Sequence, residues 1–379
     1  MDYRKRIQAF QKQVQADLIF FPLSADLQYL TGIPRDLPNF GAVIHPGAWL
    51  EGVWMTPTHT PILTVSRMTA ELGGVNAGEF AEFRVLGEFA DPASLVKSII
   101  QEFKIPDKPI VAIGDKVSGE TVSALHEILP RATFKSATDP LRQLRMSKSE
   151  DEIAIMRQAG VITEAAFADV LKVLKHGMTE LDVIAETNYQ LRRHGALGDS
   201  FVTSMYNSGP NHPLLFGNRL DTWKRPLIAP VSLLFDFGAI YEGYCYDYGR
   251  TVYFGEPNAE QQRVYDLVMA AQKAGIKAMK AGQVTAAEVD AAARQVIVDG
   301  GYGEEFRHRL GHSIGLDVHE PPFLTAIDHT TLQEGMLFTV EPSITQFNTF
   351  SARVEDVVVA RPGGGEPLTT GYQSLIVVE

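Results

Sequence analysis

Short apolar runs alternate with amphipathic helical stretches over the first third of the chain. The runs 16–21 and 109–113 are rich in β-forming residues, whereas 117–129 has the polar and apolar spacing of a helix. Such alternation is typical of an α/β layer. We therefore predict a first domain over residues 1–140, followed by a second domain over 141–379.

The second domain repeats one order of elements, in which two helices are followed later by a β-hairpin. In the first pair, one helix covers 150–175 and the next begins at Thr179. In the second pair, one helix covers 259–281 and the next begins at Thr285. Capping boxes, in which Ser or Thr precedes Glu by three residues, open 150–175 and the second helix of the later pair. Two such units predict an α+β domain with pseudo-twofold symmetry, its sheet covered by helices.

The first hairpin, residues 231–254, carries two carboxylates inside β-rich runs. If its turn is centred between Tyr241 and Glu242, Asp236 lies directly opposite Asp247 on one face, with Cβ atoms about 5 Å apart. Like charges placed in this way destabilise a sheet, and an isolated carboxylate in an apolar strand is costly to bury. A cation between the two carboxylates would remove both problems.

A second hairpin has the same character, because Glu341 and Glu355 are symmetric about Asn348 in two further β-rich runs. Four carboxylates are neutralised by two divalent ions and not by one. The two hairpins therefore predict a centre with two metal ions, built jointly by both repeated halves.

Three histidines, His308, His312 and His319, lie within twelve residues between the two hairpins, with glycines among them. A single histidine is more often structural. Neutral imidazole is, however, the commonest metal ligand and the usual proton carrier near pH 7. Three imidazoles beside two acidic hairpins favour a ligand and proton-transfer role.

Length, composition and charge restrict the class of protein. A chain of 379 residues that is 45% apolar has enough material for two domains with substantial cores. The net charge of −12 argues against a nucleic-acid partner. No apolar run has the length of a signal peptide or a membrane span, and the lone Cys245 excludes an internal disulfide and fits a reducing compartment. We expect a cytoplasmic protein with no membrane contact.

The order of these residues resembles that of the pita-bread metallopeptidases, which include Xaa-Pro aminopeptidases, prolidases, methionine aminopeptidases and creatinases. The resemblance extends from about residue 30 to residue 356 and is greatest to members with a creatinase-type N-terminal domain. It rests on five phrases: Asp236-Phe-Gly, Gly243-Tyr-Cys-Tyr-Asp247, Gly311-His312-Ser-Ile-Gly-Leu-Asp-Val-His319-Glu, Gly335-Met-Leu-Phe-Thr-Val-Glu341-Pro and Arg353-Val-Glu355-Asp356.

The resemblance implies a creatinase-type α/β domain followed by a pita-bread catalytic domain that binds two ions. It implies that Asp247 and Glu355 bridge both ions, that Asp236 holds one, and that His312 and Glu341 hold the other. Such an oxygen-rich set suits manganese, with cobalt, iron or zinc as alternatives.

The resemblance also implies roles in catalysis. A hydroxide bridging the two ions would attack the scissile carbonyl, with Glu341 relaying its proton and His319 stabilising the oxyanion. His308 would contact substrate and carry protons, and Arg353 would orient the ligands beside the substrate. The implied assembly is a homodimer in which the N-terminal domain of one subunit lies near the active site of the other.

Three positions depart from the family pattern. A family histidine seven residues after the glycine of a Ser-Gly motif is replaced by Phe216, and the nearest substitute is His212, which could equally be a turn histidine. Dipeptide-specific prolidases tend to carry an arginine, which binds the substrate carboxylate, where this chain has Phe323. Gly249 replaces a threonine, and we expect the metal site to survive that loss.

These departures leave the substrate open. The first hypothesis is an Xaa-Pro aminopeptidase or dipeptidase that cleaves the bond before proline. The second is an enzyme of the same fold that acts on a small non-peptide molecule, either an amide or amidino hydrolase or a lyase. The third is a binding module without catalysis, which the complete ligand set disfavours.

Overall fold

The computed structural model describes residues 1–35, 45–73, 81–213 and 219–378, and the chain forms two compact units, 1–145 and 146–379. The expected boundary, between residues 140 and 141, lies inside helix α6, Thr138–Met146. In the structure α6 belongs to the first unit, because Arg145 forms a buried ion pair with Asp26 at 2.6 Å. The boundary therefore falls at the end of α6.

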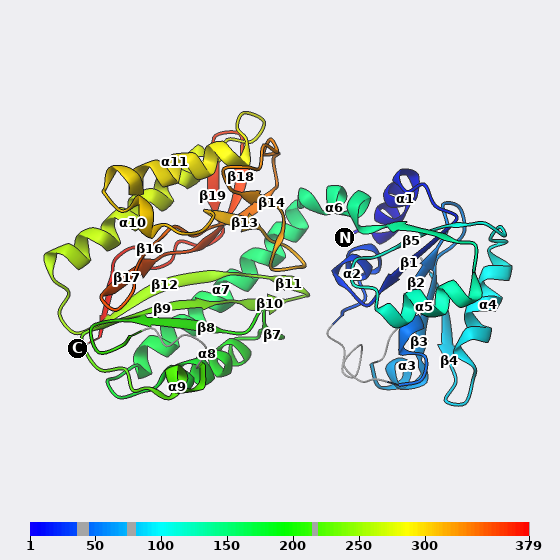
Figure 1. The fold of residues 1–379 in the computed structure, drawn as a ribbon, viewed down its shortest axis with the longest axis horizontal. Helices are drawn as coiled ribbons and strands as arrows, with labels where there is room; N and C mark the ends of the chain where they lie inside the picture. The colour runs from blue at the N-terminus through cyan, green and yellow to red at the C-terminus, as the bar shows by residue number, and fades with distance from the viewer. Residues whose placement is uncertain (36–44, 74–80, 214–218, 379) are drawn as a thin grey trace. The chain divides into compact units, whose positions relative to one another are not determined.

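The first unit is an α/β layer around one six-stranded sheet in the order β4-β3-β2-β1-β5-β6 (Figure 1). β2 pairs antiparallel with β1 and β3, and the other neighbours are parallel. Phe20 and Trp54 pack together in its core. The strands are β1 Leu18–Pro22, β2 Gly52–Met55, β3 Ile62–Ser66, β4 Glu82–Leu86, β5 Ile110–Ile113 and β6 Thr133–Ser136. The helices are α1 Tyr3–Gln13, α2 Ala25–Thr31, α3 Arg67–Gly73, α4 Pro92–Glu102, α5 Gly119–Ile128 and the 3₁₀ turn η1 Ala48–Leu50.

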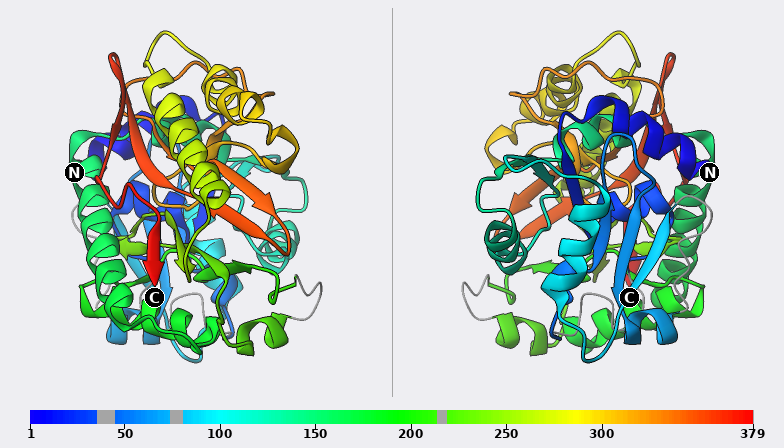
Figure 2. Two further views of the ribbon diagram at one scale, coloured as in Figure 1. Left: turned by 90° about the vertical axis from the view of Figure 1, so that its left-hand side faces the viewer. Right: turned by 90° about the vertical axis from the view of Figure 1, so that its right-hand side faces the viewer.

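The second unit contains the two predicted helix pairs. The pairs are α7 Glu150–Val173 with α8 Glu180–Arg193, and α10 Ala259–Ala278 with α11 Ala286–Asp299. Capping boxes open α7 and α11 as the sequence indicates, and α8 has one as well, since both reciprocal hydrogen bonds form in each. α8 and α11 lie on opposite sides of the strands (Figures 1 and 2). Two short elements, α9 Arg219–Lys224 and η2 Gly303–Glu305, complete the helical part.

No helix in the described ranges of the chain is both long enough and apolar enough to cross a membrane.

The strands of the second unit form two principal sheets, one from each half. The first half contributes most of the sheet β20-β12-β9-β8, and the second half contributes the sheet β14-β13-β15-β18-β19. Smaller sheets are β11-β10-β7 and β16-β17. The bounds are β7 Gly198–Asp199, β8 Ser204–Ser208, β9 Val231–Phe237, β10 Ala239–Tyr241, β11 Tyr244–Cys245, β12 Tyr248–Phe254, β13 Gly311–Ser313, β14 Glu320–Leu324, β15 Leu337–Val340, β16 Ser343–Gln346, β17 Phe350–Arg353, β18 Asp356–Arg361, β19 Gly364–Pro367 and β20 Ile376–Val378.

The register of the first hairpin differs from the expected one. Asp236 in β9 lies opposite Gly249 in β12, so the expected direct pairing with Asp247 is wrong by two residues. The turn is centred on Glu242 and Gly243, which have φ values of 48° and 81°. Positive φ at both positions is the geometry of a two-residue type I′ turn, which fixes the register. A shift by two residues keeps every side chain on its own face, so the two aspartates still share one side.

The second hairpin has the predicted register. Ser343 pairs with Arg353 in β16 and β17, and Val340 pairs with Asp356 in β15 and β18. Both pairs are symmetric about Asn348, which has a φ of 65° at the tip. Glu341 and Glu355 therefore face each other at the break between the two paired segments.

Candidate metal centre

The two hairpins meet where Gly249 of β12 pairs with Glu355. The Glu355 amide donates to the Gly249 carbonyl at 2.9 Å, and the Gly249 amide donates to the Glu355 carbonyl at 3.2 Å. A Cβ atom on residue 249 would lie 2.9 Å from the Glu355 Cβ and 3.1 Å from its Oε2. Glycine at this position, where the resemblance leads one to expect threonine, therefore permits the close approach that brings both carboxylate pairs together.

The five expected ligands converge in the second unit, and His319 joins them. Ligand atoms within each of three groups lie within 4.8 Å of one another. Glu355, Asp247 and His312 each belong to two of the groups. The groups are Asp236 with Asp247 and Glu355, His312 with Glu341 and Glu355, and Asp247 with His312 and His319.

Burial of the carboxylates disfavours their charged form and so favours a bound cation. Glu355 is fully buried and Asp247 is nearly so. Burial, and then the charges of Asp236 and Glu341, raises the pKa of Asp247 well above its usual range. Burial also raises the pKa of Glu355, against the opposing charge of Arg353. A divalent ion would replace the protons that these groups otherwise favour, so metal affinity should fall at acid pH.

Two buried oxygens test whether a metal fits this site. Asp247 Oδ1 and Glu355 Oε1 are inaccessible to solvent and accept no hydrogen bond from the described residues. Buried polar atoms are rarely left unsatisfied unless a ligand or ion completes them. Hard carboxylate oxygens of this kind with one imidazole form a donor set suited to divalent first-row ions. The residues present therefore fit a metal centre.

Arg353 lies against the same carboxylates. Its guanidinium donates to Asp236 Oδ2 at 2.9 Å, to Glu355 Oε2 at 2.8 Å and to Glu341 Oε2. Three contacts from one fixed, planar cation hold the carboxylates in one arrangement. Arg353 is therefore a positioning group at the centre, as well as part of a neighbouring pocket.

His312 is held in a form that can bind metal. Burial lowers its pKa to about 3, so its imidazole is neutral at physiological pH. The centroid of its ring lies 3.9 Å from the centroid of the His319 ring. Thr339 connects two candidate ligands, because its hydroxyl accepts from the His312 amide at 3.1 Å and lies 3.2 Å from Glu341 Oε1.

A cavity of about 250 Å³ lies beside the carboxylates. His308 and Arg353 line it from the metal side, and His212 lines it from the loop before β9. His308 Nε2 is 2.6 Å from the Ser343 hydroxyl, and burial lowers the pKa of His308. The other lining residues are Tyr206, Asn207, Ser208, Leu234, Ser343, Thr345, Phe347, Asn348 and Ser351.

His212 combines the two interpretations that the sequence left open. It is almost completely buried, and its Nε2 lies 3.1 Å from the Pro226 carbonyl, as expected of a histidine that stabilises a turn. It also lines the cavity, where its Nδ1 has no hydrogen-bond partner in the described part of the chain. Phe216, the position of the missing family histidine, lies outside the described residues.

The environment of His212 predicts a dependence of stability on pH. Burial, assisted by the nearby charge of Arg225, lowers the pKa of His212 below 6.5. Between the lowered pKa and pH 6.5, the unfolded chain binds more protons at this histidine than the folded protein does. The stability that neutral His212 contributes is therefore present above pH 6.5 and is lost as the pH falls. His212→Gln should therefore lose less thermal stability between about pH 8 and about pH 5 than the wild type. An equal loss of melting temperature in both proteins would contradict this.

Several residues that support the centre were not identified from the sequence. Lys148, just before α7, pairs with Glu320 at 3.0 Å, and both side chains are buried. The pair is separated by 172 positions, and no sequence pattern indicates it. Thr339 could have been found, since alternation in β15 places it on the same face as Glu341.

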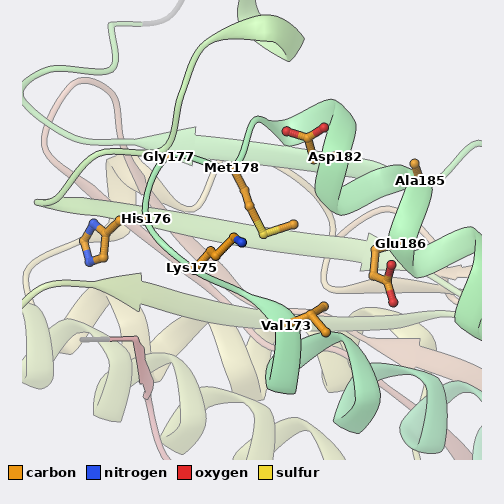
Figure 3. Close-up of a pocket in the computed structure, with 8 residues that line it drawn as sticks. All are labelled: Val173, Lys175, His176, Gly177, Met178, Asp182, Ala185 and Glu186. Carbon is orange, nitrogen blue, oxygen red and sulfur yellow. The ribbon is translucent and has the colours of Figure 1, made fainter.

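Another depression, of about 680 Å³, lies at the junction of α7 and α8 (Figure 3). Its polar residues already serve local structure. The Asp182 carboxylate caps α8, the Glu186 carboxylate accepts from Gln190 at 2.7 Å, and His176 packs edge-on against Phe254. The depression lacks the convergent side chains of the metal centre, so we do not consider it a candidate for the chemistry.

Comparison with known proteins gives a family match and full-length structural likenesses. Residues 154–362 match the model of metallopeptidase family M24. A protein named Xaa-Pro dipeptidase from Lactobacillus delbrueckii subsp. lactis is 36% identical over 289 residues, which cover 74% of this chain and 76% of the relative. The crystal structure of a dipeptidase from Pyrococcus horikoshii OT3 covers 100% of both chains with a TM-score of 0.86 and 26% identity. That of an X-Pro aminopeptidase from Thermotoga maritima MSB8 also covers 100% of both, with a TM-score of 0.81 and 31% identity.

These full-length likenesses confirm the expected fold, a creatinase-type α/β domain followed by a pita-bread domain with two related halves.

Proposed function

Because the chain belongs to metallopeptidase family M24, we propose that it is an Xaa-Pro peptidase whose two divalent ions are held by the five converging residues. The observation that carries the proposal is the meeting of both acidic hairpins at the Gly249–Glu355 pair, beside a cavity lined by two histidines. The proposed substrate is a short peptide, and the bond cleaved is the one before proline.

The proposed ligands divide between the two ions. Asp247 and Glu355 are shared, Asp236 completes one site, and His312 and Glu341 complete the other. Four carboxylates balance the charge of two divalent ions, and an oxygen-rich set favours manganese over softer metals, with cobalt, iron or zinc as alternatives. Bound ions would supply an activated water and polarise the scissile carbonyl.

The residues around the ions hold the substrate and move protons. Glu341 lies between Thr339 and Arg353, which fix its two oxygens, so its carboxylate is positioned to accept a proton from the attacking water. His319 is exposed beside His312 and can donate to the developing oxyanion. His308, linked to the Ser343 hydroxyl, faces the cavity and can hand a proton to the departing nitrogen.

The cavity supplies a place for the proline ring. Leu234 and Phe347 provide apolar surface, and His212 and His308 provide polar atoms at its wall. Its volume of about 250 Å³ suits one small side chain or ring and excludes an extended segment of polypeptide. Pockets of this composition typically fix one group of a ligand and leave its orientation to a few polar contacts.

A panel of substrates tests the proposal. Protein stripped of metal and reloaded with manganese should hydrolyse Xaa-Pro dipeptides or tripeptides, whereas peptides of the same length without proline should react much more slowly. The metal-free protein should be inactive with every substrate.

The panel also distinguishes the alternatives. Hydrolysis of small non-peptide amides or amidines, with no turnover of any Xaa-Pro peptide at full manganese loading, would reject the peptidase and favour the small-molecule enzyme. If the protein does not bind metal, only the third hypothesis remains, that of a binding module without catalysis.

We further propose a cytoplasmic homodimer with the N-terminal domain of one subunit near the active site of the other. Cys245, a buried cysteine that forms no disulfide, supports a reducing compartment. A monomer mass in size-exclusion chromatography with light scattering would contradict the dimer.

A further inference from the structure

Arg309 is a cation beside the metal centre with no ion-pair partner among the described residues. Its guanidinium carbon lies 4.9 Å from the centre of the Phe323 ring. Its Nε atom is buried without a hydrogen-bond partner in the described ranges. A guanidinium stacked on an aromatic face keeps its edge free for a planar anion.

The position of Phe323 shows where the Arg309 guanidinium lies relative to the proposed metal ligands. In the pairing of β13 with β14, Phe323 lies directly opposite His312, one of the proposed metal ligands. The His312 ring in turn lies 3.9 Å from the His319 ring, measured between the two centroids. The guanidinium therefore lies about one side chain away from the groups that would surround the scissile bond.

Neighbouring arginines already have other partners. Arg353 binds three carboxylates of the centre, and Arg294 binds Asp290 together with the backbone carbonyls of Phe306 and His308. Arg307 is exposed and stacks on Phe347 at the tip of the second hairpin, 5.3 Å from its ring centre. Arg309 is the better placed and less solvated candidate for an anion.

We propose that the Arg309 guanidinium binds the C-terminal carboxylate of a dipeptide substrate whose scissile bond lies at the metal centre. The inference rests on the proposed peptidase function and makes its substrate class narrower. Consecutive Cα atoms are about 3.8 Å apart, so only in a dipeptide is the terminal carboxylate within one residue of the scissile bond. A longer peptide presents an uncharged amide at the same place.

The position of Arg309 also bears on the departure at Phe323. A phenylalanine cannot bind a carboxylate, and by itself it argues against a strict dipeptidase. In this chain the phenylalanine supports an arginine that comes from the segment before β13. The positive charge is thus retained at the same wall of the site, although it comes from a different position in the sequence.

Kinetics on two matched substrates test the inference. Manganese-loaded wild type, Arg309→Met, Arg309→Lys and Arg307→Met are compared on Ala-Pro and on its C-terminal amide, after equal metal content and folding have been verified. We expect the wild type to prefer Ala-Pro. Arg309→Met should raise KM for Ala-Pro by roughly 10- to 100-fold, as loss of a charged hydrogen-bonded pair implies, with little change for the amide. Arg309→Lys should be intermediate, and Arg307→Met should resemble the wild type.

The outcomes separate this inference from the proposed function. Equal losses on both substrates in Arg309→Met, or a wild type that prefers the amide, would overturn the carboxylate site while leaving the peptidase intact. A shift in selectivity caused by Arg307→Met would transfer the site to Arg307 and reject Arg309. A wild type that cleaves neither substrate with its metal fully loaded would reject the peptidase, and this inference with it.

Discussion

Glu355→Gln is expected to lose bound metal and to lower peptide hydrolysis by about a thousandfold or more, because a bound ion contributes several kcal/mol to the transition state. Glu355 belongs to two of the three groups of candidate ligands, so its loss affects both proposed ion sites. Elemental analysis of the purified variant, together with its turnover of Xaa-Pro peptides, measures the two effects. A variant that keeps both ions and full activity would show that the proposed ligand set is wrong.

The same substitution has a second expected effect, on stability. In the metal-free protein, glutamine removes one of four crowded carboxylates, so Glu355→Gln should unfold at a temperature no lower than that of the metal-free wild type. Manganese should raise the melting temperature of the wild type and not that of the variant, since ligand binding stabilises only a protein that binds the ligand. Glu256 is an exposed acid in the loop after β12, and Glu256→Gln is the control. This variant should retain the rise in melting temperature with manganese.

The helices and the second hairpin were predictable because local features specify them. The capping boxes at Ser149 and Thr285 require only a residue three positions away, and both form as expected. The symmetry of Glu341 and Glu355 about Asn348 indicates a register that the structure confirms. In both cases the information lies within a few residues or within one hairpin.

The first hairpin shows where such reasoning fails. Alternation fixes only the face on which each side chain lies, so registers that differ by two residues fit the pattern equally well. The choice between them depends on the turn, where Glu242 adopts a positive φ that is uncommon for a residue with a side chain. The two aspartates could thus be assigned to one face, whereas their exact partners could not.

Contacts between distant segments were beyond sequence reasoning. Arg309 and Phe323 could each be noted, but their stacking depends on how the segment before β13 approaches β14. The Lys148–Glu320 pair joins the start of the second unit to the end of the histidine segment. Neither pair leaves a periodic trace in the sequence, because each depends on tertiary packing.

The Lys148–Glu320 pair carries the second large expected effect. The Lys148 ammonium is 3.0 Å from Glu320 Oε2 and 3.5 Å from the Ser313 hydroxyl, so it joins the residues that follow His312 and His319. Lys148→Met should destabilise the protein by about 3–5 kcal/mol, because it removes the cation that is paired with a buried carboxylate. It should also weaken metal binding by about 10- to 100-fold, since His312 and its neighbours lose a support. Denaturant unfolding and metal titration measure these two changes.

The matched controls separate burial from charge. Lys172→Met removes a surface ion pair with Asp169, in which the Lys172 side chain is 73% exposed. The substitution should lower the free energy of unfolding by less than about 1 kcal/mol. The double variant Lys148→Met with Glu320→Gln removes both buried charges of the pair and should recover much of the lost stability. If Lys148→Met costs no more than Lys172→Met, the buried pair does not hold the histidine segment. If the double variant regains stability but not metal affinity, the pair serves chiefly to position His312 and His319 at the metal centre.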